Sequence, residues 1–143
     1  MSVLFVPVLV IHVVIAVLGL GSILSIAVLA TTARRTGWAS SDISAWLGPL
    51  LRYSAFSLAV MLATGILMDV VVGGSLHEWW WFRGSALLLV LTGILHGRAR
   101  RAIRRELVHA DARDAVLRRV ERLAYGMCAL VAAITILMEV KPF

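Results

Sequence analysis

Four long apolar runs constrain this chain more than any other feature of its sequence. They cover about residues 3–32, 50–72, 79–97 and 123–140. A helix of roughly 20 apolar residues is long enough to cross the ~30 Å hydrocarbon core of a bilayer. The sequence therefore predicts an all-α fold in which residues 1–143 form a single polytopic membrane domain, a bundle of four transmembrane helices.

Composition supports this assignment and excludes other classes of protein. The chain is 61% hydrophobic and only 15% charged, which leaves too little charge to cover a soluble domain. Its one cysteine, Cys128, excludes a disulfide scaffold and dithiol redox chemistry. No basic residue precedes the first run, which is also longer than the apolar core of a signal peptide, so we expect a retained helix.

The basic residues indicate how the helices are oriented. Most arginines fall in or beside two segments, 33–50 and 98–122, whereas the opposite side of the predicted bundle carries only Arg83 and Lys141. By the positive-inside rule, both segments are cytoplasmic loops and both termini are extracytoplasmic, as in a multi-pass protein of the bacterial inner membrane. The net charge of +6 then indicates contact with the lipid bilayer rather than with nucleic acid. A homo-oligomer or a larger membrane complex is also compatible with the sequence.

Each apolar run contains one ionisable side chain toward its extracytoplasmic part, which is costly inside a membrane and needs a reason. These side chains are His12, Asp69, Arg83 and Glu139. If they face inward, they form a polar pocket that opens outward, with Asp69 and Glu139 available to neutralise Arg83. Alternatively, the last three extend to the outer headgroups.

His12 is the deepest of these groups and the strongest candidate for a ligand or metal site. On a helix it shares a face with Ala16 and Gly19, and small neighbours leave a groove in which a flat macrocycle can lie. The same small residues would also let two helices pack closely, and a neighbouring hydroxyl or carbonyl would satisfy a buried histidine. His96 lies roughly 10 Å deeper at 1.5 Å per residue, which argues against a His12–His96 axial pair for haem within one subunit.

Methionines offer a second kind of metal site. Met61 and Met68 are seven residues apart in the second run, and Met138 of the fourth run can lie near them. Thioethers combined with a histidine suit copper(I), although methionine is also ordinary packing in apolar helices.

Two segments carry motifs that resemble those of a known family. In the segment His12–Ser22, the histidine is followed after six residues by Gly-Leu-Gly-Ser. This resembles the first-helix pattern of HemJ-type membrane proteins and related CopD-like domains, which is histidine, six residues, and Trp-x-Gly-Gly. The segment Trp79–Arg98, with Arg83 four residues after its tryptophan, is similar to the family's Trp-x-x-x-Lys helix that ends in a basic stretch.

The resemblance implies a small bundle of four or more transmembrane helices. HemJ-type proteins oxidise protoporphyrinogen and are thought to carry haem b, and they depend on the first-helix histidine and the third-helix lysine. The resemblance therefore implies haem b as a cofactor, with His12, Gly19, Arg83 and His96 as candidate cofactor-binding residues. Because Arg83 replaces the lysine and cannot deprotonate near neutral pH, the resemblance carries over architecture and cofactor binding but not the oxidase activity.

Three functions stay open on this basis. The first is the binding of haem b, a porphyrin or a similar flat redox ligand through His12, with Arg83 pairing a propionate or acidic partner. The second is a non-enzymatic membrane subunit or scaffold that packs through small-residue helix faces, including Gly93 and Gly97. The third is a small transporter in which the two carboxylates of the polar pocket couple proton movement to uptake.

Overall fold

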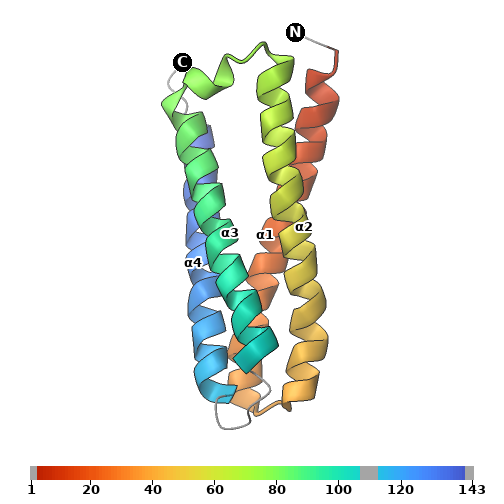
Figure 1. Ribbon diagram of the computed structural model, residues 1–143, viewed down its shortest axis with the longest axis vertical. Coiled ribbons are helices and arrows are strands. Elements are labelled where there is room, and N and C mark those ends of the chain that lie inside the picture. The colour runs from red at the N-terminus through yellow and green to blue at the C-terminus, as the bar shows by residue number, and fades with distance from the viewer. Residues whose placement is uncertain (1–2, 107–112, 141–143) are drawn as a thin grey trace.

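Four long α-helices make up the fold in the computed structural model, which describes residues 3–106 and 113–140 (Figure 1). In chain order they are α1 (Phe5–Thr36), α2 (Ser40–Val71), α3 (Trp80–Glu106) and α4 (Arg113–Glu139), with a short 3-10 turn, η1 (Leu76–Glu78), between α2 and α3. The described residues contain no β-strand. The predicted all-α fold of four helices is confirmed.

The helices pack as two antiparallel hairpins. α1 pairs with α2, α3 pairs with α4, and α1 also packs along α4. α2 and α3 make far less contact with each other than the helices within either hairpin do. The α1–α2 connection lies at one end of the bundle with the end of α3 and the start of α4, whereas η1 lies at the opposite end (Figure 1).

Three of the helices are long and apolar enough to cross a membrane. They are Phe5–Thr36, Ser41–Val71 and Arg113–Glu139. In α3 the apolar stretch is interrupted by Arg83 near its start and is followed by arginines from Arg98 onward, so its apolar part is shorter. A crossing by residues 79–97 therefore stays a prediction.

The structure differs from the sequence prediction at Pro49. The sequence favours a short interfacial helix that Pro49 limits before a span starting at residue 50, but α2 continues from Ser40 through Pro49 without a break. Proline has no N–H and so loses one helical hydrogen bond. The turn is held by packing, because Ile43, Leu47 and Leu51 fall four residues apart on one face and are 0%, 0% and 2% exposed.

The two predicted cytoplasmic loops are largely helical. Gly37 has a left-handed backbone (φ 73°), which glycine adopts without strain, and it ends α1 so that α2 can begin after residues 37–39. The ends of the predicted basic loop, residues 98–106 and 113–122, belong to α3 and α4. Both helices thus continue past the apolar runs.

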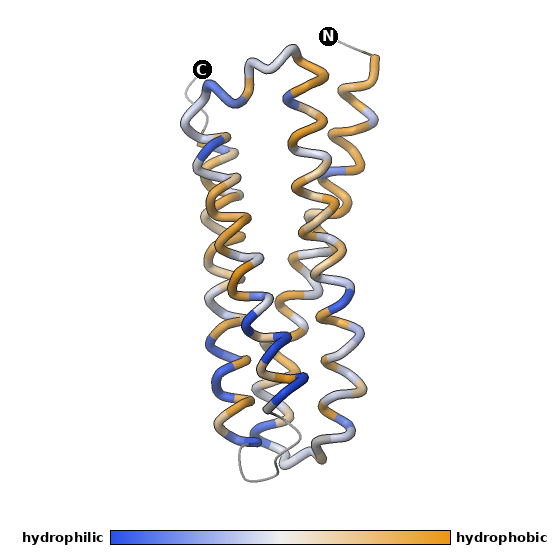
Figure 2. The backbone as a smooth tube through the Cα atoms, viewed as in Figure 1, coloured by the Kyte–Doolittle hydropathy of each residue, from blue (hydrophilic) through white to orange (hydrophobic). Residues whose placement is uncertain are grey.

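The end of the bundle that carries most arginines has a buried apolar core. We call this part the basic half and define it as residues 23–52, 97–106 and 113–127. Its buried side chains come from all four helices: Ile23, Ile26, Ala27, Ala30, Ala33, Ile43, Leu47, Leu51, Ala99, Ala102, Ile103, Val116, Leu117, Val120, Ala124 and Met127. Hydrophilic residues are concentrated in this half of the chain (Figure 2). Most apolar residues of this half therefore pack in a core, although Leu24, Val28 and Trp46 are half exposed or more.

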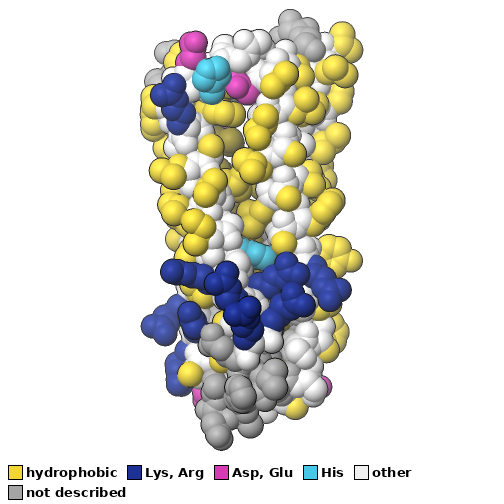
Figure 3. Space-filling model, in the orientation of Figure 1, with side chains coloured by type: hydrophobic (Ala, Val, Ile, Leu, Met, Phe, Trp, Pro, Cys, Tyr) yellow, Lys and Arg dark blue, Asp and Glu magenta, His cyan; other side chains and the backbone are white. Residues whose placement is uncertain are grey.

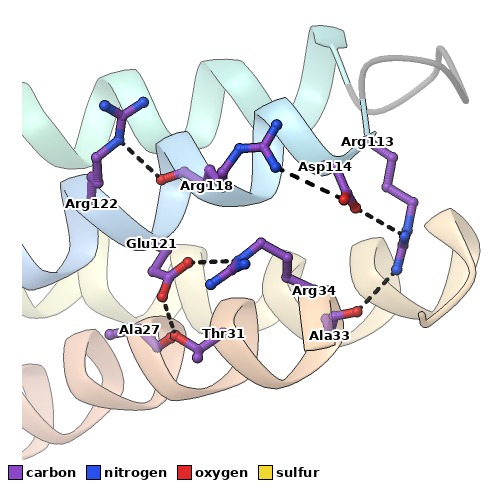
Figure 4. Close-up of polar contacts among 9 residues, drawn as sticks. All are labelled: Ala27, Thr31, Ala33, Arg34, Arg113, Asp114, Arg118, Glu121 and Arg122. Atoms are coloured by element: carbon purple, nitrogen blue, oxygen red, sulfur yellow. Dashed lines mark hydrogen bonds and ion pairs between the residues drawn. The ribbon is translucent and has the colours of Figure 1, made fainter. Parts of the chain in front are cut away.

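Polar contacts also join α1 to α4 in the basic half (Figure 4). Glu121 accepts a hydrogen bond from Thr31 Oγ1 (2.9 Å) and pairs with Arg34, whose Nε lies 3.0 Å from Glu121 Oε2. Arg113 donates to the carbonyl oxygen of Ala33 (2.9 Å) at the end of α1, and this oxygen also accepts from the backbone N–H groups of Gly37 and Trp38.

The other end of the bundle, the terminal half, is built in the opposite way. It comprises residues 5–22, 53–96 and 128–140. Its sequence is mostly hydrophobic (Figure 2), and hydrophobic side chains cover the face seen in Figure 3. Val14, Leu18, Phe56 and many similar side chains are more than half exposed or close to it. The buried polar side chains of the described residues all lie in this half: His12, Ser54, Ser57, Ser85, Thr92 and His96.

Candidate functional site

The terminal half contains a cavity of about 80 Å³ among all four helices. Its walls are apolar except for His12 of α1 and Ser85 of α3. The lining residues are His12, Met61, Leu62, Gly65, Ile66, Phe82, Ser85, Ala86, Leu89, Ile134 and Met138. The cavity thus combines a histidine, a hydroxyl group and two thioethers within apolar walls.

The hydrogen bonds around Thr64 fix the state of the His12 ring. His12 Nδ1 lies 2.7 Å from Thr64 Oγ1. Thr64 Oγ1 itself donates its only proton to the α2 backbone, at the carbonyl of Val60 (2.8 Å) or Met61 (3.2 Å). With the Thr64 proton on a backbone carbonyl, the hydroxyl oxygen accepts from His12 Nδ1–H, and in this tautomer Nε2 carries the lone pair. Metal-binding histidines are commonly oriented by such a bond from the other ring nitrogen.

Ser85 is the second polar group of the cavity. Its side chain is 5% exposed, and its hydroxyl oxygen has no hydrogen-bond partner among the described residues. Buried hydroxyl groups are nearly always hydrogen-bonded, so an orphan of this kind needs an explanation. Its position on the cavity wall makes it a group that a bound ligand or water can satisfy.

The thioethers of Met61 and Met138 reach the same cavity from α2 and α4. Met68, the third methionine that the sequence singled out, is buried but does not line the cavity. No cluster of three or more His, Cys, Asp or Glu side chains able to hold a metal occurs among the described residues. The donor groups that the cavity residues offer a metal are one imidazole and two thioethers, which are soft or intermediate ligands.

Asp69 and Arg83, two members of the predicted polar cluster, hold the α2–α3 connection instead of lining the cavity. Asp69 Oδ1 accepts from the backbone N–H groups of Leu76 (2.8 Å) and His77 (3.1 Å), and Asp69 Oδ2 lies 3.1 Å from His77 Nδ1. Arg83 Nε donates to the carbonyl oxygen of His77 at 2.6 Å. Glu139 is exposed at the end of α4. Asp69 and Arg83 thus hold the connection that follows α2, and neither residue lines the His12 cavity.

Gly19 serves helix packing. A Cβ at Gly19 would lie 2.9 Å from Ser57 Cβ, so α1 and α2 approach each other too closely there for any side chain. This is the packing role that the sequence left open as an alternative to a groove for a macrocycle. His12, Ala16 and Gly19 do share one face, and that face is turned toward the bundle.

His96 lies apart from His12, as its depth in the sequence predicts. His96 Nε2 is 2.8 Å from Ser54 Oγ, and both side chains are buried between α2 and α3. Ser54 and Thr64, the partners of the two histidines, are ten residues apart on α2, which is about 15 Å along a helix. The two imidazoles therefore cannot ligate one iron from opposite sides.

Sequence reasoning missed Thr64 and Ser85. A signal for Thr64 was present, because His12 and Thr64 are each 26 residues from Trp38 in the α1–α2 connection. In an antiparallel hairpin such residues lie at the same level. Counting residues from the α1–α2 connection cannot place Ser85 beside His12, because Ser85 lies on α3, which belongs to the other hairpin.

Comparison of the chain with protein-family models, curated proteins and solved structures found no match. The resemblance to HemJ- and CopD-type proteins therefore stays a prediction from the motifs alone.

Proposed function

We propose that the chain is a multi-pass protein of the bacterial inner membrane in which the terminal half crosses the bilayer. The α1 part of this half, residues 5–22, is about 27 Å long at 1.5 Å per residue, close to the thickness of the hydrocarbon core. Its exposed apolar surface meets lipid, and α3 crosses with the other helices because Leu87 and Ile94 are also exposed. The basic half then projects into the cytoplasm, with both termini extracytoplasmic.

We further propose that the cavity is a soft-metal site within the membrane, with His12 Nε2 and a methionine thioether as ligands. The observation that carries this proposal is that His12, oriented through Nδ1 by Thr64, lines one cavity together with Met61 and Met138. Imidazole and thioether are the ligands that copper(I) prefers, and a neutral imidazole carries no charge to bury. Ser85 is available to a ligand water or a second small ligand.

The family resemblance implies haem b. The cavity residues offer suitable axial ligands for it, but the cavity is too small to hold it. One histidine and one methionine are a known axial pair for haem iron. The cavity of about 80 Å³ is well below the 300–1,000 Å³ typical of pockets for small organic ligands. A haem or porphyrin would require α2 and α3 to separate, the neighbouring helices with the least mutual contact. The geometry therefore favours a small soft ion.

The test is copper(I) and haem binding by the purified full-length protein in detergent. Copper(I) is titrated in competition with a chromophoric chelator, and haem binding is followed by absorption in the oxidised and reduced states. We expect one copper(I) per chain, lost in His12→Ala and at least tenfold weaker in Met61→Leu. Met68→Leu is the matched control and should bind as the wild type does. Thr64→Val should weaken binding less than His12→Ala, because it frees the ring without removing the ligand.

Other outcomes are equally informative. A Soret band that appears on adding haem and disappears in His12→Ala would replace the ion by haem b. Binding of neither, or copper(I) binding that survives in His12→Ala, would contradict a His12 site.

A second candidate function is a non-enzymatic scaffold or subunit. It is supported by Gly93 and Gly97, which are exposed on the outer face of α3 with nothing within 4 Å of a Cβ placed at either position. Small residues on a membrane helix allow the close approach of another helix. If this function is correct, Gly93→Leu should change the mass of the assembly in detergent, while His12→Ala leaves it unchanged.

A further inference from the structure

A hollow of about 420 Å³ lies on the outer face of α3 where the basic half begins. It is lined by Gly97, Arg100, Arg101, Arg104 and Arg105. The opposite face of this part of α3 belongs to the core, since Ala99, Ala102 and Ile103 are buried. The helical period therefore keeps the arginine face on the outside of the bundle.

The positive charge around this hollow is not neutralised by described carboxylates. Glu121 and Asp114 pair with other arginines, namely Arg34, Arg113 and Arg118. No ion pair joins a described carboxylate to any arginine of the hollow. Four guanidinium groups around one open hollow match the chemistry of a phosphate, which guanidinium binds through two parallel hydrogen bonds.

The hollow adjoins apolar surface on the side toward the terminal half. Gly97 has nothing within 4 Å of a Cβ placed on it, and Gly93, one turn further along α3, is equally open. Val90 and Ile94 beside them are about half exposed. Figure 3 shows Lys and Arg side chains gathered in a band across this face, directly beside the hydrophobic surface. A ligand with a phosphate attached to acyl chains matches both surfaces, whereas a nucleic acid matches only the charge.

We propose that this hollow binds the headgroup phosphate of an anionic phospholipid of the cytoplasmic leaflet. One acyl chain then lies along Gly93 and Gly97, where α3 has no side chains in the way. The arginines four residues apart, Arg101 and Arg105, hold the phosphate from one side of the helix. The proposal rests on the membrane placement proposed above and is independent of the His12 site.

The test measures lipid binding by native mass spectrometry of the full-length protein in detergent. The probes are phosphatidylglycerol, phosphatidylcholine and inorganic phosphate. We expect the wild type to retain phosphatidylglycerol in preference to phosphatidylcholine. R101Q/R105Q should weaken phosphatidylglycerol binding roughly 25-fold, at about fivefold per arginine. The matched control R118Q/R122Q removes the same charge from α4 and should change binding less than about twofold. Equal losses in both double variants would indicate attraction by net charge and would overturn the site.

Gly97→Leu provides a second variant that changes no charge. It fills the hollow from a position with open space around it, and leucine favours a helix more than glycine does. The thermal midpoint of unfolding should therefore stay the same or rise while phosphatidylglycerol binding falls. Unchanged lipid binding in this variant, or displacement of the lipid by inorganic phosphate, would overturn the proposal. His12→Ala in the same assay should retain phosphatidylglycerol. The lipid proposal is therefore tested independently of the metal site at His12.

Discussion

The basic half and the terminal half of this bundle contrast in what they bury. The basic half buries isoleucine, leucine, valine and alanine in one core and carries most of the arginines. The terminal half exposes its apolar side chains and buries two histidines, three serines and a threonine. The same four helices cross both halves, so the difference comes from side-chain placement and not from backbone architecture.

The contrast has a physical cause if the terminal half lies in lipid. Lipid is as apolar as leucine, so burying leucine between membrane helices gains little, and small or hydrogen-bonded residues hold the helices together. In water, burying apolar surface is the dominant stabilising term. The function that we propose follows the same division, because a neutral histidine in apolar surroundings suits a soft ion whereas the arginine face suits a phosphate.

The largest effect is expected when one leucine from each half is replaced by alanine. Leu117 is 0% exposed in the basic half, and Leu18 is 61% exposed in the terminal half. Leu117→Ala should lower the free energy of unfolding in detergent by about 2–5 kcal/mol, because it leaves a cavity in a buried apolar core. Leu18→Ala should change it by less than about 0.5 kcal/mol. Equal losses, measured by denaturant titration, would mean that both halves are packed in the same way.

A smaller effect is expected from the close approach of α1 and α2 in the terminal half. Gly19→Ala places a Cβ 2.9 Å from Ser57 Cβ, so the helices must move apart, at about 1–3 kcal/mol. Gly21→Ala on the same helix meets nothing within 4 Å and should be neutral or stabilising by up to about 1 kcal/mol. The thermal midpoints of the two variants check this prediction. A Gly19→Ala protein as stable as Gly21→Ala would show that packing there is loose.

The smallest effect concerns the ion pair of the basic half and its pH dependence. The hydrogen bond from Arg34, assisted by that from Thr31, lowers the pKa of Glu121 below its ordinary value of 4.5. The stability that this pair contributes is therefore present above pH 4.5 and is lost as the pH falls through the lowered pKa. The side chains of Arg34 and Glu121 are 30% and 18% exposed, so the contribution is about 0.2–1 kcal/mol.

Glu121→Gln measures this contribution. Its free energy of unfolding should be lower than that of the wild type at pH 7, and the difference should shrink as the pH falls below 4.5 toward 3. A difference that stays constant over this range would show that the carboxylate charge is not what stabilises the contact.

Much of the fold could be predicted from the sequence, but little of the site. The apolar runs predict the four helices, and the depth of His12 and His96 correctly keeps them apart. The continuation of α2 through Pro49 could not be predicted, because the cost of proline is local whereas the packing of Leu47 and Leu51 involves other helices. The role of Asp69 was missed because its partners belong to the connection that follows it.

The sequence by itself determined the helices, their order and the end at which the arginines gather, because these follow from hydropathy and charge along one chain. Only the tertiary structure decided which apolar residues face a core and which face outward, since residues 23–33 and 5–22 are similarly apolar. It also decided what lies beside His12, because Met61, Ser85 and Met138 reach the cavity from three other helices. The rotation of each helix about its axis sets these contacts, and that rotation depends on how all four helices pack together.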